Sequence, residues 1–411
     1  MRSEDVRALG ALAGGAAAGI ATQARDVHTG IADRVFGLLG PAAAPTRAIH
    51  DRVSESAYSG ARALTGALVR GGAFAYGLTR PHEAPALETH PRARLGLGAL
   101  NGAFGDMLER TGNPLAMPMT IRHAGRPLDF DRDAIAGVIT QPRSRLAIFL
   151  HGLCETEDAW RFGAARHQPY GDRLEAELGY TSLSVRYNSG RHISHNGRRL
   201  AECLNELTAA WPVPVTEIAF VGHSMGGLVA RGACHYGAGH DWVPKVRDVV
   251  MLGTPHRGAP LELVANAATH AISLLPETRP FAGPLRARSA GVKDLGYGYV
   301  VDEDWDGHDP DAFWTDTGTD IPFLDSADHY FVSATLTREP EAPLGRMFGD
   351  LLVLRKSAWA HEKHGERLRF GIDRYRHLGG ATHFDLLNHP AVYELIEGWL
   401  TGGRPALPAP A

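Results

Sequence analysis

The segment "AFVGHSMGGLVA", residues 219–230, constrains the fold more than any other part of the chain. One apolar run ends at Gly222, and a second, with helical spacing, begins directly after Ser224. A strand that turns so abruptly into a helix strains the backbone of the corner residue, and the residues two positions to either side must be small. Gly222 and Gly226 meet that requirement. The segment therefore predicts a nucleophile elbow that exposes the hydroxyl of Ser224.

The rest of the central region alternates short β-branched runs with helical stretches. We expect strands at 119–123, 134–140, 145–152, 181–188, 217–224, 246–255 and 329–335, and helices near 170–177, 197–210, 225–236 and 390–400. Strands that alternate with helices form a mostly parallel sheet covered on both faces. The sequence therefore predicts an α/β fold whose ligand site lies at the carboxyl ends of the strands.

The first 80 residues have a different composition, rich in Ala and Gly. Two apolar stripes with helical spacing, separated by Pro41 and Pro45, consist of Ile31, Val35, Leu38 and Leu39, and of Val53, Ala61, Leu64 and Leu68. Residues 1–80 are therefore predicted to be an N-terminal helical extension. Its polar faces carry both charge signs, which favours a packing or oligomerisation arm over a lipid-binding surface.

The remaining boundaries follow from changes in pattern along the chain. Residues 81–116 contain prolines and are predicted to be a linker, and the main domain is predicted to span 117–403, with a short tail at 404–411. Residues 260–328 interrupt the strand and helix alternation, so we interpret them as a cap or lid inserted into the domain. The apolar side chains suited to a lid are Leu261, Leu263, Val264, Ile272, Leu274 and Leu275.

Charge and cysteine content exclude several classes of protein. The formal net charge is -4 and the basic residues are dispersed, so nucleic acid is not an expected partner. The three cysteines do not build a disulfide framework and suit a reducing compartment, which favours a cytoplasmic location over an exported or membrane-peripheral one. No apolar run reaches the length of a transmembrane helix. Residues 8–22 imitate a signal-peptide core, but the preceding segment has no net positive charge.

A serine hydroxyl needs a histidine base, and the histidine needs an acid that fixes its tautomer. Among 21 histidines, His383 lies in "GGATHFDLLNHP", a glycine-opened loop shortly before the last predicted helix, and is the preferred base. His389 is the alternative, although it precedes Pro390 and would instead flank the start of that helix.

Asp350, in "RMFGDLLVLRKSA", is the preferred acid because it follows a predicted strand and precedes His383. Three competitors lie in "VDEDWDGHD", inside the insertion, and resemble a solvated loop or a cation site more than a buried triad member. They are Asp302, Asp304 and Asp306.

Acyl transfer also needs two N–H donors that hold the oxyanion. In "AIFLHGLCETEDAW", Leu150 ends a strand and His151 and Gly152 make a turn, so the N–H of Leu153 is predicted to point into the site. Met225, the first residue after Ser224, is the second predicted donor. Cys154 has no base placed beside it and is interpreted as a small wall residue.

Two further polar segments border the predicted site. His256 and Arg257 follow a strand and could bind substrate, although small residues there mainly let the strand leave the sheet. Residues 186–201 are dense in Asn, Arg and His, and we expect them to fix the wall of the site and to cap the following helix.

The motifs "LHGL", "GHSMGG", "MLGTPHRGAP", "GDLLVL" and "THFDLLNHP" occur in the order seen in the α/β-hydrolase superfamily. Over about residues 117–403 the chain resembles its bacterial lipase and esterase families, including relatives of the GPI inositol-deacylases. The resemblance implies a serine esterase or lipase with the triad Ser224, Asp350 and His383, oxyanion donors at Leu153 and Met225, and no cofactor or metal. Leu351 departs from the glycine that commonly follows the acid.

The expected reaction is hydrolysis of a carboxylic ester with an apolar acyl group, through an acyl-enzyme. The same constellation serves acyltransferases, thioesterases and amidases, which remain alternatives. A protein that keeps the fold but only binds a lipid or a partner is a third class. The sequence does not determine the oligomeric state.

Overall fold

The structure is a computed structural model that describes residues 2–39, 44–79, 87–258, 288–308, 318–319, 321–335 and 374–403. The chain divides into two compact units. The N-terminal unit comprises residues 1–94, 108–116 and 264–288, and the sheet unit comprises residues 95–107, 117–263 and 289–411.

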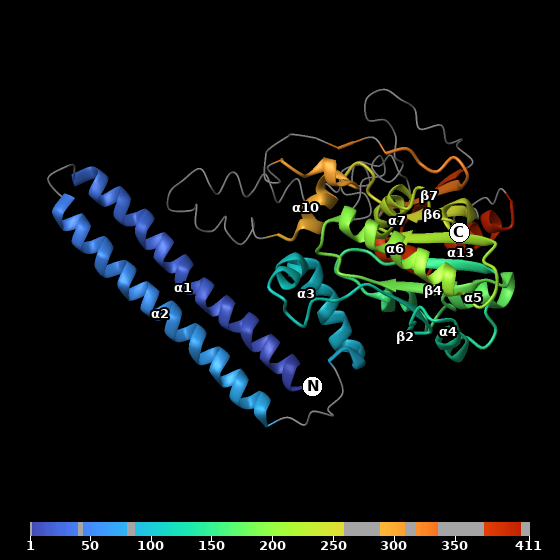
Figure 1. The fold of residues 1–411 in the computed structure, drawn as a ribbon. Helices are drawn as coiled ribbons and strands as arrows, with labels where there is room; N and C mark the ends of the chain where they lie inside the picture. The colour runs from blue at the N-terminus through green and yellow to red at the C-terminus, as the bar shows by residue number, and fades with distance from the viewer. Residues whose placement is uncertain are drawn as a thin grey trace. The chain divides into compact units, whose positions relative to one another are not determined.

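Within the described residues the helices and strands follow one another in the order shown in Figure 1. The helices are α1 (Ser3–Leu39), α2 (Ala44–Leu78), α3 (Pro91–Arg110), α4 (Arg132–Val138), α5 (Tyr170–Leu178), α6 (Ile193–Ala210), α7 (Met225–Tyr236), α10 (Ala290–Tyr297) and α13 (Pro390–Leu400). The strands are β1 (Thr120–His123), β2 (Arg126–Pro127), β3 (Arg145–Leu150), β4 (Thr181–Arg186), β5 (Glu217–His223), β6 (Val246–Leu252), β7 (Asp328–Thr335) and β8 (Tyr375–Gly379). Short 3-10 helices are η2 (Leu87–Thr89), η3 (Glu157–Arg161), η4 (Val243–Lys245), η6 (Asp302–Asp304) and η8 (His383–Leu387).

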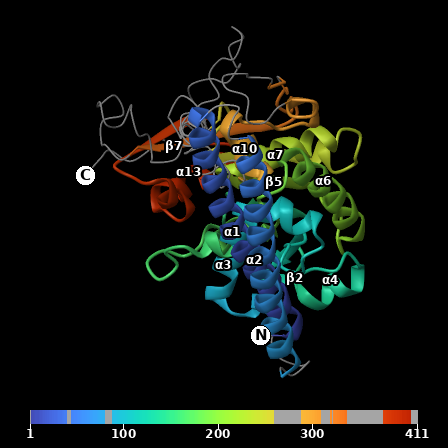
Figure 2. The ribbon, with the colours of Figure 1, turned by 90° about the vertical axis from the view of Figure 1, so that its left-hand side faces the viewer.

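The N-terminal unit contains the expected helical pair, and α1 and α2 run side by side in opposite directions (Figure 2). Arg25 of α1 pairs with Glu55 of α2 at 3.5 Å. The predicted stripe on α2 is wrong at Leu64 and Leu68, whose side chains are 62% and 66% exposed. The close approach of the two helices is made instead by small residues, since a Cβ added to Gly10 would overlap Ala73.

None of the helices in the described residues is both long enough and apolar enough to cross a lipid bilayer. Residues 81–116, predicted to be a linker, contain the helix α3, and residues 95–107 of that helix belong to the sheet unit. The helix has no strong apolar stripe, because Gly98, Gly102 and Gly105 occupy positions where it packs closely on other loops.

In its described residues the sheet unit is built on one eight-stranded sheet of order β2-β1-β4-β3-β5-β6-β7-β8. Strand β1 pairs antiparallel with β2 and β4, and every pairing from β4 through β3 to β8 is parallel. The predicted mostly parallel α/β sheet is therefore confirmed. Strand β4 lies on one side of β3 and β5 lies on the other, so the order in which strands are added to the sheet reverses at β3. Open parallel sheets bind their ligands at such a point.

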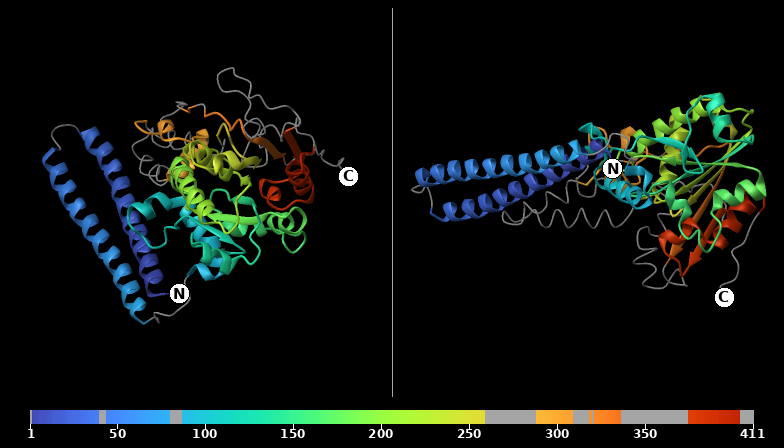
Figure 3. Two further views of the ribbon diagram at one scale, coloured as in Figure 1. Left: turned by 45° about the vertical axis from the view of Figure 1, so that its right-hand side comes forward. Right: turned by 90° about the horizontal axis from the view of Figure 1, so that it is seen from below.

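Helices cover both faces of this sheet (Figure 3). Leu146, Ile148 and Leu150 of β3 belong to one buried cluster together with side chains of α6 and α7. Ala147 and Phe149 of the same strand belong to the other, with side chains of α5 and α13. This alternation is the twofold periodicity of a strand buried on both sides, which explains why β3 reads as a continuous apolar run.

One predicted strand is wrong. Residues 134–140 were expected to extend, but Arg132–Val138 form the helix α4. The carboxylate of Asp131 accepts the N–H groups of Asp133 at 3.1 Å and Ala134 at 3.0 Å, which caps the helix and outweighs the β-branched residues that suggested a strand.

Candidate active site

Ser224 lies at the turn between β5 and α7, at the carboxyl edge of the sheet. Its backbone has φ 53 and ψ -122, a conformation strained for a residue with a side chain. The N–H of Ser224 donates to the carbonyl of Leu252, the last residue of β6, at 2.8 Å. The predicted strand–turn–helix corner is therefore present, with its strain at the expected residue.

The two glycines flanking the serine are required by close backbone approaches. A Cβ at Gly222 would lie 2.6 Å from the nitrogen of Gly227, and one at Gly226 would lie 2.8 Å from the carbonyl oxygen of His151. Both distances are shorter than any normal carbon contact, and the atoms met are backbone atoms that cannot rotate away. Strand β5 and helix α7 can meet at this angle only without side chains at these two positions.

The turn after β3 adjoins the elbow. Leu150 is the register partner of Gly222, so the next residues of both strands emerge together. A Cβ at Gly152 would lie 3.1 Å from the Cβ of Ser224. The N–H of Gly152 donates to Glu155 at 2.7 Å, and that of Cys154 donates to the hydroxyl of Ser189 at 3.1 Å.

The two predicted oxyanion donors differ from their neighbours in this turn. Throughout the described part of the chain, no hydrogen bond uses the N–H of Leu153 or of Met225. Met225 is the first residue of α7. Backbone N–H groups at the start of a helix have no intrahelical acceptor, and the positive end of the helix dipole lies there. Both N–H groups are available to an incoming acceptor.

His383, the predicted base, begins η8 and is 2% exposed. Its ring centroid lies 4.6 Å from that of His223, the residue before the nucleophile. A Cβ at Gly253 would lie 2.8 Å from Cε1 of His383, so the ring covers the end of β6. The loop is held by a capping box in which the N–H of Thr382 donates to Asp385 at 2.7 Å. The structure thus brings His383 to the elbow.

His389, the alternative base, occupies the N-cap of α13 with Pro390 in the first turn, as its sequence position indicated. Its Nδ1 accepts the N–H of Ala391 at 3.2 Å. The ring caps the start of that helix, whereas His383 packs against His223, the residue before Ser224.

Asp350, the predicted acid, lies outside the described residues. Asp304 is buried and accepts the N–H groups of Val300 at 2.7 Å and Val301 at 3.0 Å. Asp302 pairs with Arg198 at 2.5 Å. Asp304 therefore organises its own loop, Asp302 joins that loop to α6, and Asp306 is exposed. Within the described ranges, no three His, Cys, Asp or Glu side chains are grouped to hold a metal ion.

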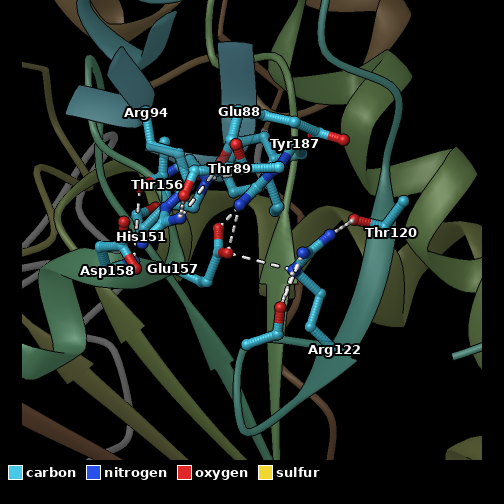
Figure 4. A network of polar contacts seen from close by, with 12 residues as sticks. Glu88, Thr89, Arg94, Thr120, Arg122, His151, Thr156, Glu157, Asp158 and Tyr187 are labelled. Atoms are coloured by element: carbon cyan, nitrogen blue, oxygen red, sulfur yellow. Dashed lines mark hydrogen bonds and ion pairs between the residues drawn. The ribbon is translucent and has the colours of Figure 1, made fainter. Parts of the chain in front are cut away.

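A buried ionic network, which the sequence analysis did not anticipate, supports the turn after β3 (Figure 4). Oε2 of Glu157 accepts a hydrogen bond from Nε of Arg186 at 2.6 Å, and Oε1 lies 3.0 Å from Nε of Arg122. Burial alone would raise the pKa of Glu157, but the Arg186 guanidinium lowers it below its ordinary value.

The first residue of the same turn is held by a tyrosine (Figure 4). The hydroxyl of Tyr187 donates to the carbonyl of His151 at 2.6 Å, and the two rings stack with centroids 4.2 Å apart. Burial lowers the pKa of His151, which keeps the ring neutral. The only signal in the sequence was the position of these polar residues directly after apolar strands.

The polar segment 186–201 supports the wall of the site, as expected. Asn188 is buried and donates to the carbonyl of Gly105 in α3 at 2.9 Å. The capping prediction is wrong in detail, because the side chain of His192 does not cap α6. Asp294 of α10 accepts the N–H of Ile193 at 2.8 Å and does so instead.

His256 is buried, with ring centroids 5.8 Å from Phe323 and 5.4 Å from Phe331. Burial lowers its pKa well below the ordinary value. It packs inside the unit, so its role is structural, in line with the view that this segment lets the strand leave the sheet.

A second pair that the sequence analysis missed lies against the elbow itself. Oε2 of Glu155 is 3.2 Å from Nδ1 of His223, and Nε2 of His223 is 3.2 Å from the carbonyl oxygen of His383. Burial would raise the pKa of Glu155, but the His223 ring and the Gly152 N–H lower it to about 2.

Comparison with known families gives one match to a family model, a PGAP1-like alpha/beta domain, over residues 145–270. That segment contains β3 to β6 and the elbow. None of the curated proteins matches the sequence.

Solved structures are similar at low identity. The mature lipase BlEst2 of Bacillus licheniformis is 18% identical, with 69% of this chain and 98% of that chain covered and a TM-score of 0.40. An esterase of Pyrobaculum calidifontis is 12% identical, with 74% and 86% covered and a TM-score of 0.36. The lin2722 product of Listeria innocua is 14% identical, with 63% and 94% covered and a TM-score of 0.36.

Proposed function

We propose, from an α/β-hydrolase fold whose residues 145–270 match a PGAP1-like alpha/beta domain, that this chain hydrolyses carboxylic esters through an acyl-enzyme on Ser224. The observation that carries the proposal is the strained backbone of Ser224, at φ 53, between β5 and α7. A fold has no structural need for a strained non-glycine residue at this corner, since glycine would be free of the strain there. A serine nucleophile explains it.

In the proposed mechanism Ser224 attacks the ester carbonyl while His383 accepts its proton. The carbonyl oxygen becomes an oxyanion, and the N–H groups of Leu153 and Met225 bind it. His383 then protonates the departing alcohol. A water molecule, deprotonated by His383, attacks the acyl-enzyme and releases the acid. Asp350 is the proposed partner that stabilises the imidazolium.

The arrangement of N–H groups supports the proposed oxyanion hole. In the turn after β3 the N–H groups on either side of Leu153 are already bonded to Glu155 and Ser189. Such bonds fix the peptide planes of the turn before substrate arrives, and preorganised donors are the largest single contribution in acyl transfer.

The proposed substrate is an ester with an apolar acyl group, and residues 260–328 are the proposed lid. Acyl transfer to another acceptor, thioester hydrolysis and amide hydrolysis use the same groups, so substrates must separate them. A reducing, cytoplasmic setting is also proposed, since Cys154, Cys203 and Cys234 are all free.

The first experiment measures hydrolysis of p-nitrophenyl esters of increasing acyl length by the wild type and by Ser224→Ala. We expect Ser224→Ala to lose at least about a thousandfold in kcat. Ser56→Ala, on the exposed side of α2, is the control and keeps full turnover. A preference for short chains would indicate an esterase, and one for long chains a lipase.

Equal turnover by wild type and Ser224→Ala would remove Ser224 as the nucleophile. If neither turns over any ester, matched thioesters and amides are tested next, together with covalent labelling by a fluorophosphonate. Labelling of the wild type that is absent in Ser224→Ala shows an activated serine without reference to the natural substrate.

A further inference from the structure

His223 is fully buried directly before the nucleophile, and each of its ring nitrogens faces an oxygen atom. Nδ1 lies 3.2 Å from the Glu155 carboxylate, and Nε2 lies 3.2 Å from the carbonyl oxygen of His383. A carbonyl oxygen has no proton to donate, so the second contact requires a proton on Nε2. A neutral imidazole has only one N–H, and its other nitrogen would then present a lone pair to Glu155.

The position of the remaining proton follows from a third group. The same Oε2 of Glu155 that faces His223 accepts the N–H of Gly152 at 2.7 Å. A backbone N–H donated to Oε2 favours the ionised carboxylate, which has no proton to offer to His223. Nδ1 of His223 must therefore supply the proton, so that the ring holds one on each nitrogen.

We propose that Glu155 and His223 form a buried carboxylate–imidazolium pair that positions three parts of the proposed active site against one another. The pair joins the turn that carries Leu153, the corner that carries Ser224, and the backbone of His383. The inference rests on the proposed function, since it assigns these residues a positioning role in that reaction.

The surroundings of the pair favour a fixed geometry. A Cβ at Gly152 would come within 3.1 Å of Oε2 of Glu155 and 3.2 Å of Nδ1 of His223. The Trp160 ring meets the His223 ring edge to face at 6.4 Å, and the Phe384 ring lies at 6.4 Å. Among the described residues, the titratable neighbours are His383, whose ring is 4.6 Å from that of His223, and His151, whose buried ring is neutral.

A buried ion pair is seldom the most stabilising choice, because the desolvation of two charges offsets their attraction. Its use here is geometric. Charge-assisted hydrogen bonds are directional, and this pair reaches from one loop to another across the residue next to the nucleophile. A shift of about 1 Å between an oxyanion donor and a base can cost about a hundredfold in rate.

The direct test is nuclear magnetic resonance of the full chain with histidine rings labelled with nitrogen-15. The His223 signal is identified by its loss in His223→Gln. We expect both ring nitrogens of His223 to carry protons near neutral pH, where a solvent-exposed histidine is largely neutral. In Glu155→Gln we expect the ring to lose one proton and keep the one on Nε2. A wild-type ring with one bare nitrogen near neutral pH would overturn the proposal.

The kinetic test compares Glu155→Gln with Glu175→Gln. Glu175 is a matched control, since it accepts the N–H of Ser182 at 2.8 Å and lies 3.6 Å from Nδ1 of His123, at the opposite end of β4. We expect Glu155→Gln to lower kcat by about tenfold to a hundredfold with KM changed less than about twofold, and Glu175→Gln to change neither.

Glu155→Asp, which keeps the charge on a shorter side chain, should recover part of the loss in kcat. An unchanged kcat in Glu155→Gln would exclude the positioning role. If the wild type hydrolyses no ester, the proposed function fails, but the protonation of His223 still decides whether the ion pair exists.

Discussion

Glu157 and Arg186 form a bidentate ion pair in which each side chain is only 5% exposed. Arg122 approaches the same carboxylate at 3.0 Å, so one buried carboxylate faces two guanidinium groups (Figure 4). The network fastens η3 to β1 and β4, and η3 follows the turn that carries Leu153. It therefore anchors the segment that directly follows the proposed oxyanion turn.

Glu157→Gln should destabilise the protein strongly, because it leaves the buried guanidinium of Arg186 and the mostly buried one of Arg122 without their anion. We expect the free energy of unfolding to fall by about 3 to 5 kcal/mol, measured by urea denaturation. Glu177→Gln is the control, since Glu177 pairs with Arg173 on the surface of α5, and it should cost about 0.5 kcal/mol or less. Equal losses in the two variants would mean that the network contributes no more than a surface pair.

Helix α3 gives a second prediction. A Cβ at Gly102 would lie 2.7 Å from the nitrogen and 2.8 Å from the Cα of Cys154, whose φ of 63 already places it in the left-handed region. Gly102→Ala must displace this backbone, so we expect a loss of stability of about 1 to 3 kcal/mol and lower ester turnover.

Gly96→Ala in the same helix is the control for Gly102→Ala. Nothing lies within 4 Å of the added Cβ at Gly96, so alanine should stabilise the helix by about 0.5 to 1 kcal/mol. Urea denaturation of both variants checks the opposite signs. A stabilised Gly102→Ala would contradict the close packing of α3 on the turn.

The central sheet could be predicted from the sequence because its strands are buried on both faces. The runs at residues 146–150 and 218–221 are continuously apolar and are followed by turn residues, so periodicity and punctuation agree. Strand β8 was missed, since "YRHLG" is mostly polar and only partly buried. It pairs at the edge, where the neighbouring strand β7 supplies the hydrogen bonds that local sequence does not signal.

In the candidate site, too, features set by neighbouring residues could be predicted and features set by distant residues could not. The geometry of Ser224 follows from adjacent residues, because a strand, two glycines and a helix are all local features. The partners of Glu155 and Glu157 could not be predicted, since His223 and Arg186 reach them only through the pairing of β3 with β5 and β4. Likewise the sequence of α3 resembled a linker, because the positions at which this helix packs on another loop are glycines and form no apolar stripe.

Asp248 predicts an unusual dependence of stability on pH. Burial, with the nearby charges of Glu217 and Asp328, raises its pKa from 3.8 to about 7. Between about pH 4 and about pH 7, Asp248 therefore keeps its proton in the folded state and has lost it in the unfolded state. The free energy of unfolding should fall as the pH rises from about 4 to about 7. Asp248→Asn removes this dependence.

We therefore expect Asp248→Asn to be more stable than the wild type above neutral pH, by roughly 2 to 4 kcal/mol, and little different from it near pH 4. Urea denaturation at both pH values measures the difference. The same difference at both values would show that Asp248 is ionised throughout.

The cysteines give a prediction that separates the two nucleophiles available near the site. Burial raises the pKa of the Cys154 thiol, with a further contribution from the Glu155 charge, and it raises those of Cys203 and Cys234 to about 11 and about 12. Alkylation needs the thiolate, so iodoacetamide at mildly alkaline pH should inactivate the protein slowly or not at all. A fluorophosphonate should inactivate it stoichiometrically through Ser224. Cys154→Ser should retain the turnover of the wild type. An inactive Cys154→Ser variant, or rapid inactivation of the wild type by iodoacetamide, would place the nucleophile on Cys154 instead.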